Sequence, residues 1–295
     1  MQNKLEIICD GDSWVFGSEI VDPELVKQHP PGVYCGEYDY QEENDSYRVP
    51  LIFPRHLGEL FDANVTNLSW PADDNNSILT RTMSYVCEHY LSKGKSTENL
   101  FVMIGWSSPE RNSFWYKDEN ISHPFRLWPH VKNFETPQQE EFWKLYVMYL
   151  YNQEEYITRH VRNVMQFQDF CNSHNIKWLC WNSFYQDPGA HVDGWEDLDM
   201  NATLKALQHG VGGFQLRRSN ELTRNSGMIN LQAMWDTVDD VRFYKKNEPN
   251  NTFKSYILAN KDTIGEPFVG LHPNPPAHKA WANELYRYIN EHNLL

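Results

Sequence analysis

Short, nearly continuous apolar runs alternate with longer amphipathic stretches along most of the chain. Runs of this kind are typical of strands in a parallel sheet that is covered on both faces. Each run ends at Gly, Asn or Asp residues, which favour turns. The pattern predicts strands at residues 5–9, 64–68, 100–104 and 176–181.

Three amphipathic stretches predict helices. Residues 77–91 carry apolar side chains at the 3.6-residue period, and residues 276–290 do so at the end of the chain. The longest stretch, 136–171, begins with Thr136 as N-cap, Pro137 and a capping-box Gln139. Strands that alternate with helices indicate an α/β fold with three layers, α/β/α, and a mainly parallel, doubly wound sheet.

The length of 295 residues suits one domain with insertions. We interpret residues 1–295 as a single domain with loop insertions at about 21–54 and 184–267, because both stretches exceed what simple crossovers need. Ligand sites in such sheets lie at the carboxyl ends of the strands. Insertions at that rim are where substrate-recognition loops usually grow.

Composition and charge limit the partners. Hydrophobic residues make up 40% and aromatic residues 14% of the chain, so global disorder is excluded. No apolar run is long enough for a membrane span, and the N-terminus lacks the pattern of a signal peptide. A net charge of −14 disfavours nucleic acid and anionic membranes as partners.

Five cysteines without a CxxC pair fit a reducing compartment and predict neither a disulfide framework nor a thiolate zinc site. We therefore expect a cytoplasmic protein, or a virion-associated one if the source is a phage. The oligomeric state stays open.

Two local patterns carry candidate chemistry. The turn Gly11-Asp12-Ser13-Trp14 follows the first strand, where a serine is presented near backbone N–H groups that can hold an oxyanion. His272 precedes Pro273 just ahead of the last helix, which fixes its orientation as a general base requires. Each pattern alone also fits a structural role, with Ser13 as a helix cap and His272 as a loop residue.

The two patterns together resemble the first and last blocks of the SGNH/GDSL hydrolases. Residues 67–76, after the second strand, resemble the second block of that family, and residues 104–111 resemble the third. The form of the third block is similar to a variant in SGNH-like proteins of phages and bacteria. The resemblance implies a flavodoxin-like SGNH topology.

The resemblance also implies a serine hydrolase acting on ester bonds, of the esterase or carbohydrate O-deacetylase type. Ser13 would be the nucleophile and His272 the base. The oxyanion would be stabilised by Ser13, Ala72 and Ser107. A small-molecule or carbohydrate ester is the expected substrate, with no cofactor and no metal. The predicted substrate-binding residues are Trp14, Trp106 and Arg111.

The chain departs from the family pattern at three positions. The second-block glycine is Ala72, whose backbone donor survives if the turn has negative φ. The third-block asparagine is Ser107, and the aspartate three residues before the histidine is Val269. A backbone carbonyl could orient the histidine instead, which would leave a Ser–His dyad. Of the two upstream carboxylates, Asp262 and Glu266, we predict Glu266 as the replacement acid. For Arg111, an ion pair with Glu110 is the alternative to contact with an anionic substrate group.

Two other functions remain open. A catalytically impaired SGNH-fold binding, virion or structural protein would also explain the changes at Ala72, Ser107 and Val269. A different α/β enzyme, such as a metal-dependent hydrolase, would need divalent metal and would be inert to serine-directed reagents.

Overall fold

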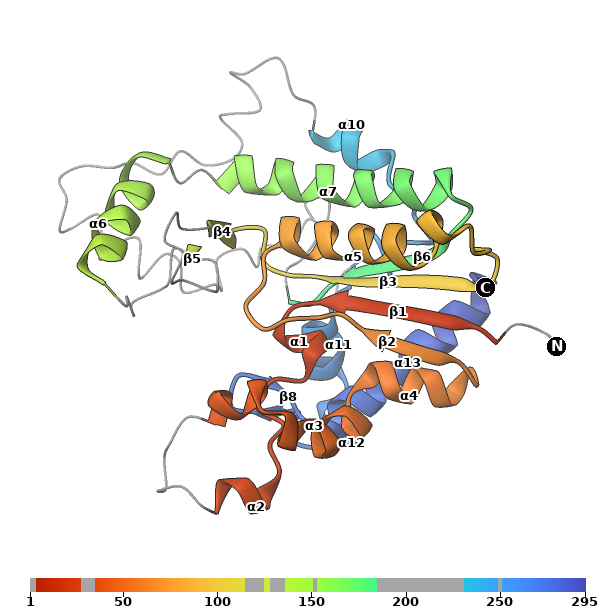
Figure 1. The fold of residues 1–295 in the computed structure, drawn as a ribbon, viewed down its shortest axis with the longest axis horizontal. Helices are drawn as coiled ribbons and strands as arrows, with labels where there is room; N and C mark the ends of the chain where they lie inside the picture. The colour runs from red at the N-terminus through yellow and green to blue at the C-terminus, as the bar shows by residue number, and fades with distance from the viewer. Residues whose placement is uncertain are drawn as a thin grey trace.

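The computed structural model describes residues 4–27, 35–114, 125–127, 136–150, 153–184, 231–248 and 251–295. Four parallel strands form the central sheet in the order β2-β1-β3-β6 (Figure 1). Their bounds are β1 Glu6–Gly11, β2 Asn64–Asn67, β3 Leu100–Trp106 and β6 Lys177–Asn182. Isolated parallel bridges from Cys180 to Phe243 and from Asn182 to Thr252 continue the pairing beyond β6. All four predicted strands are confirmed.

Helices cover both faces of the sheet (Figure 1). One layer contains α5 Asn75–His89, α7 Gln153–Ser173 and α10 Leu231–Asp236. The other contains α4 Phe53–Leu60, α11 Phe253–Ala259 and α13 Pro275–Glu291. Successive strand residues point to opposite faces, so Ile7 packs in one buried cluster and Ile8 in the other. The predicted three-layer α/β/α fold is confirmed.

One predicted helix is interrupted. The capping box at Thr136 and Gln139 is present and begins α6 Pro137–Leu145. A π-helical turn, η4 Tyr146–Leu150, follows, and α7 covers Gln153–Ser173, with residues 151–152 outside the described residues. A π-turn inserts an extra residue into the helical repeat and so changes which side chains face the core. The prediction of one helix across 136–171 was therefore wrong.

Short elements fill the connections. Part of the predicted insertion 21–54 folds as helical turns, and its residues 28–34 lie outside the described residues. In the second predicted insertion, residues 185–230 and 249–250 also lie outside the described residues. No helix among the described residues is long and apolar enough to cross a membrane. The short elements are α1 Ser13–Phe16, α2 Pro23–Val26, η1 Cys35–Tyr40, α3 Glu42–Arg48, η2 Val49–Leu51, η3 Leu91–Lys93, β4 Asn112–Phe114, β5 Phe125–Leu127, α12 Lys261–Ile264, β7 Phe268–Val269 and β8 His272–Pro273.

Two glycines let α1 pack directly against the carboxyl ends of the strands. A Cβ on Gly11 would lie 2.3 Å from Cγ2 of Val15, and one on Gly105 would lie 2.7 Å from the same atom. Because neither glycine carries a side chain, Val15 fits over the ends of β1 and β3. Ser13 is thereby fixed directly above the end of β1.

A buried histidine joins α13 to α4. Nδ1 of His278 accepts the backbone N–H of Phe53 at 3.3 Å, and its ring stacks on the Phe53 ring. Burial lowers the pKa of His278 to about 3. It also lowers the pKa of His160, on α7, to about 4. Both imidazoles are therefore neutral in the folded protein near neutral pH.

These two histidines predict acid sensitivity. Their folded pKa values lie below the unfolded value of about 6.5, so the folded state binds fewer protons and loses stability as pH falls from about 6.5 toward 4. A tenfold change in the proton affinity of one group corresponds to about 1.4 kcal/mol of stability. Urea unfolding between pH 7.5 and pH 4.5 should show a smaller loss for His278→Asn than for the parent. The exposed His174→Asn variant is the control, and equal losses in the parent and His278→Asn would contradict the assignment.

Candidate active site

The turn after β1 is built on Asp12. Its carboxylate accepts the Trp14 N–H at 3.0 Å and caps α1, whose first residue is Ser13. The same carboxylate lies 3.3 Å from a guanidinium nitrogen of Arg111. Burial raises the pKa of Asp12, and Arg111 opposes the rise. The Ser13 side chain is almost buried, and its hydroxyl makes no hydrogen bond with any described residue.

The histidine loop reaches the same edge of the sheet. His272 begins β8, which pairs with β7 so that His272 lies opposite Val269. β8 contacts α1, and the two elements lie near each other at the carboxyl ends of the strands (Figure 1). A charge on His272 is close enough to lower the pKa of Asp12 to a lesser degree than Arg111 does. The first and last predicted blocks therefore meet.

A carboxylate that the sequence analysis missed lies beside the imidazole. Oε2 of Glu19 is 3.0 Å from Nδ1 of His272. The same oxygen accepts the backbone N–H of Leu271 at 2.8 Å. Nδ1 of His272 has no hydrogen bond of good geometry, so the approach is a close contact between the carboxylate and the ring and not an aligned hydrogen bond. Val269 has no carboxylate, whereas Glu19, near the other end of the chain, places one beside this imidazole.

The position of Glu19 is fixed from both sides. Its backbone has φ 65, in the left-handed region, which costs roughly 1–2 kcal/mol for a residue other than glycine. Its N–H donates to Oδ1 of Asp39 at 2.9 Å. Burial raises the pKa of Asp39, and the Glu19 N–H opposes the rise. No sequence motif marks Glu19, because it reaches His272 only through this turn.

The loops after β2 and β3 are joined by a pair of hydrogen bonds. Asn75 accepts the Ser107 N–H at 2.8 Å and donates its amide to the Ser107 carbonyl at 3.1 Å. The Ser107 hydroxyl accepts from Arg111 at 2.9 Å and donates to Asp12. It therefore supports the turn at Ser13 and is already engaged.

The backbone φ of Ala72 is positive, and not negative as expected from the sequence. Its φ is 61, so the turn does not have the negative φ that the sequence analysis required. A left-handed residue is where glycine is favoured, which explains the strain of an alanine there. The N–H groups of Ala72 and Ser13 donate to no acceptor among the described residues. The positive φ does not remove the N–H of Ala72, so both N–H groups stay unengaged within the described part of the chain.

The structure places two of the predicted substrate-binding residues, Trp14 and Trp106, in the core, and the third, Arg111, in an ion pair. Trp106 is fully buried against Phe167, so it cannot contact a substrate in this conformation. Trp14 is 6% exposed and packs in the core against Phe253. The two indoles belong to the buried clusters on opposite faces of the sheet. Arg111 forms an ion pair near the sheet rim, with Asp12 as the partner.

Glu266 lies away from the imidazole contact. Its carboxylate is 69% exposed and lies 3.5 Å from Nζ of Lys261. Its backbone carbonyl accepts the side-chain amide of Asn274, the N-cap of α13. Among the described residues, no group of three or more His, Cys, Asp or Glu side chains is arranged to hold a metal ion.

A side chain at Gly270 would clash with the carboxylate of Glu19. Its φ is 57, and a Cβ there would lie 2.2 Å from Oε2 of Glu19. We expect Gly270→Ala to lower the free energy of unfolding by roughly 1–3 kcal/mol more than Gly265→Ala does. Gly265 also has positive φ, 83, but open space around its Cβ, so it isolates backbone strain from the clash. Urea unfolding gives both values, and equal effects would contradict the packing of Glu19.

No family model and no curated protein matches the chain in sequence. Solved structures are similar at low identity. A member of the lipolytic protein G-D-S-L family from Veillonella parvula is 12% identical, with TM-score 0.38, and the match covers 97% of this chain and 96% of that one. A psychrotrophic esterase from Pseudoalteromonas sp. is 10% identical, with TM-score 0.40 and 97% coverage of both chains.

A carbohydrate esterase family 2 enzyme with a carbohydrate binding domain, from Corynascus thermopiles, is 11% identical. The TM-score is 0.44, and the match covers 99% of this chain and 67% of that one. The function of the chain is therefore inferred from its own residues.

Proposed function

We propose that the protein is a serine hydrolase of ester bonds in which Ser13, His272 and Glu19 act together. The proposal is carried by one observation, the Glu19 carboxylate 3.0 Å from Nδ1 of His272. His272 begins β8, which contacts α1, and α1 begins with a serine whose hydroxyl makes no hydrogen bond with a described residue. A nucleophile, a base and a group that orients the base are the three parts that acyl transfer requires.

The reaction follows from these roles. Nε2 of His272 takes the proton from Ser13 Oγ while this oxygen attacks the carbonyl carbon of the ester. The tetrahedral intermediate collapses as the imidazolium gives its proton to the leaving alcohol, and an acyl-serine remains. Water, deprotonated by His272, then releases the acid and restores Ser13. Glu19 keeps the proton on Nδ1 and stabilises the imidazolium during both steps.

The oxyanion hole in this proposal consists of backbone donors. The N–H groups of Ser13 and Ala72 point to no described acceptor, whereas the Ser107 hydroxyl is engaged by Asp12 and Arg111. Removing one donor from an oxyanion hole costs roughly 2.7–4 kcal/mol of transition-state stabilisation. We therefore expect a slower esterase than one with a third donor in place.

The alternative of a binding protein without activity rested on the changes at Ala72, Ser107 and Val269. The Glu19 carboxylate beside the same imidazole removes the reason based on Val269. The substitutions at Ala72 and Ser107 then affect the rate and not the presence of the reaction. Small esters of an alcohol or a sugar are the proposed substrates.

Ser13→Ala should reduce kcat on short p-nitrophenyl esters by at least about 10³-fold, because no other group replaces the nucleophile. The exposed Ser46→Ala, outside the site, is the matched control. Initial rates at saturating ester provide the comparison. If Ser13→Ala turned over these esters as fast as the parent, the proposed nucleophile would be excluded.

Glu19→Gln and Glu266→Gln distinguish the two candidate acids. We expect Glu19→Gln to lower kcat by about 10²- to 10⁴-fold with little change in KM, because an amide stabilises the wrong tautomer of the imidazole. Glu266→Gln should stay within about twofold of the parent, since its carboxylate is exposed and pairs with Lys261. Steady-state kinetics and circular dichroism of each variant test this. The reverse pattern would assign the acid to Glu266.

A further inference from the structure

Two exposed aromatic rings lie in contact beside the proposed site. Tyr40, at the end of η1, and Trp70, after β2, are 54% and 45% exposed. Their ring centroids are 5.3 Å apart with an interplanar angle of 48°. Large aromatic side chains are usually buried, and exposed ones in contact often mark binding sites.

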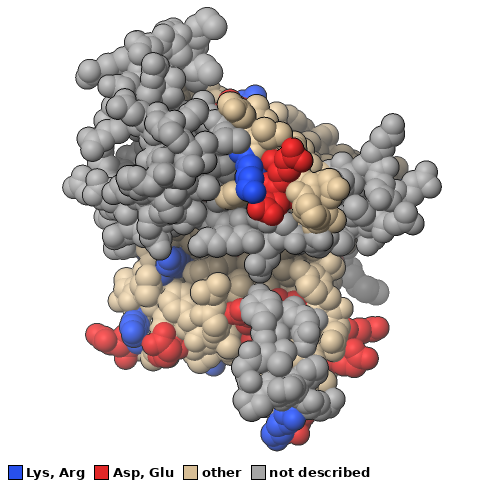
Figure 2. Space-filling model, turned by 90° about the vertical axis from the view of Figure 1, so that its left-hand side faces the viewer, with Lys and Arg blue, Asp and Glu red and all other residues tan. Residues whose placement is uncertain are grey.

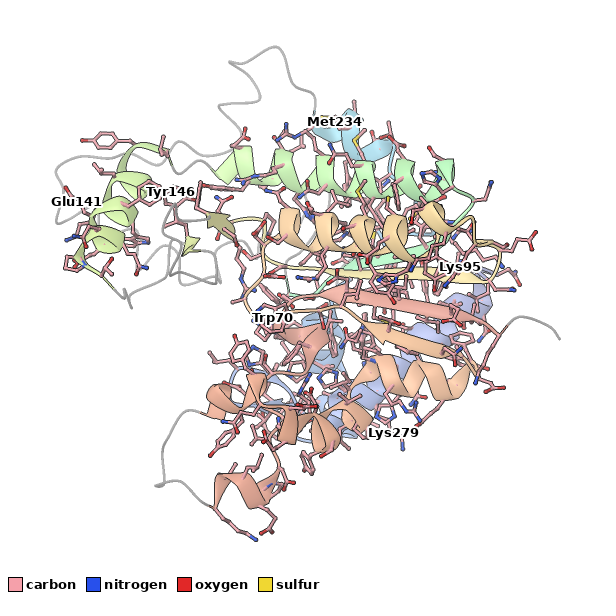
Figure 3. The ribbon with its side chains drawn as sticks, viewed as in Figure 1. Trp70, Lys95, Glu141, Tyr146, Met234 and Lys279 are labelled. Carbon is pink, nitrogen blue, oxygen red and sulfur yellow. The ribbon has the colours of Figure 1, made fainter. Side chains whose placement is uncertain are left out.

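Trp70 is anchored to the turn that holds Ser13. Its backbone N–H donates to the Gly11 carbonyl at 3.1 Å. Its indole packs edge-on against Phe16, the last residue of α1, at 6.2 Å. Phe16 is in turn covered by the guanidinium of Arg48, 3.6 Å from its ring centre. The indole is therefore supported from beneath, and Figure 3 shows Trp70 beside α1 at the carboxyl ends of the strands.

Tyr40 is connected to the other side of the site. It follows Asp39, which accepts the N–H of Glu19 and so helps to position that carboxylate. The tyrosine and the tryptophan thus come from the two segments that adjoin Ser13 and Glu19. The ring pair is therefore connected, through Gly11 and Asp39, to both parts of the proposed catalytic group.

The surroundings favour a neutral ligand. Asp39 directly precedes Tyr40 and accepts the backbone N–H of Glu19, so carboxylates adjoin the tyrosine along the chain and disfavour a ligand that carries a carboxylate or phosphate. Figure 2 faces this end of the molecule, and most of the described surface in that view carries neither basic nor acidic side chains. The polar cavity of about 480 Å³, lined by Lys4, Glu6 and Lys95 among others, lies at the opposite ends of the strands.

A long acyl chain is usually buried in an enclosed apolar pocket. The exposed Trp70 indole can instead lie flat against the C–H face of a pyranose, with the tilted Tyr40 ring along its edge. We propose that Tyr40 and Trp70 form a stacking platform for the sugar ring of neutral O-acylated pyranosides, with the acyl group directed toward Ser13. This assignment rests on the proposed ester hydrolysis and names its substrate class.

The first test compares an O-acetylated methyl glucopyranoside with ethyl acetate. Trp70→Ala should lower the ratio of the two kcat/KM values by about 3- to 10-fold, and Trp70→Phe should restore part of it. Tyr149→Ala removes a still more exposed tyrosine, 73%, on η4 and should leave the ratio unchanged. An unchanged ratio in Trp70→Ala would overturn the platform.

A second test does not depend on turnover. Saturation-transfer NMR should detect binding of acetylated xylotetraose to Ser13→Ala protein, and the signal should weaken at least about threefold when Trp70→Ala is added. Equal binding would exclude the platform even if Ser13-dependent hydrolysis were intact. Trp70-dependent binding without any hydrolysis by the parent would instead exclude the proposed reaction. A Trp70-dependent preference for p-nitrophenyl octanoate over the acetylated sugar would assign the rings to the acyl chain and overturn the sugar assignment.

Discussion

One oxygen atom of Glu19 connects the two ends of the chain at the proposed site. It accepts the N–H of Leu271, a residue 252 positions later in the sequence, and lies against the imidazole of His272. This contact fixes the loop ahead of α13 to the segment that follows α1. A base must be held in one orientation to act on a serine, so the chemistry proposed for the site depends on this carboxylate. Gly270 gives it room, and Asp39 holds its backbone.

Buried charges hold the serine turn on both sides. Asp10 binds Arg81 and Thr82, and Asp12 binds Arg111. Burial raises the pKa of Asp10 to about 6, although Arg81 opposes the rise. Buried ion pairs contribute little net stability after their desolvation cost. Their position on either side of Gly11 indicates that they maintain the geometry of the turn.

The sequence was sufficient for the features that depend on local pattern. Apolar runs located the strands, Thr136 caps a helix as predicted, and the order of strands and helices led to the three-layer fold. Strand alternation also indicates that Trp106 is buried, in contrast to its predicted role in substrate binding. Val102, Ile104 and Trp106 follow each other at period two and share one buried cluster, so Trp106 belongs to the core.

The features that the sequence did not reveal depend on long-range packing. Glu19 reaches His272 through a left-handed turn and a space left by Gly270, and neither has a spacing signature. The φ of 61 at Ala72 likewise follows from the turn after β2 and not from the residue type. Glu266 was the predicted replacement acid because it is near His272 in sequence. Proximity along the chain does not determine which carboxylate faces an imidazole.

The most direct test of the central claim is a crystal structure of the protein after reaction with a fluorophosphonate. We expect continuous density from phosphorus to Oγ of Ser13, with the His272 imidazole between that adduct and the carboxylate of Glu19. Unreacted Ser13, or an imidazole directed away from it with Glu19 on another partner, would contradict the account.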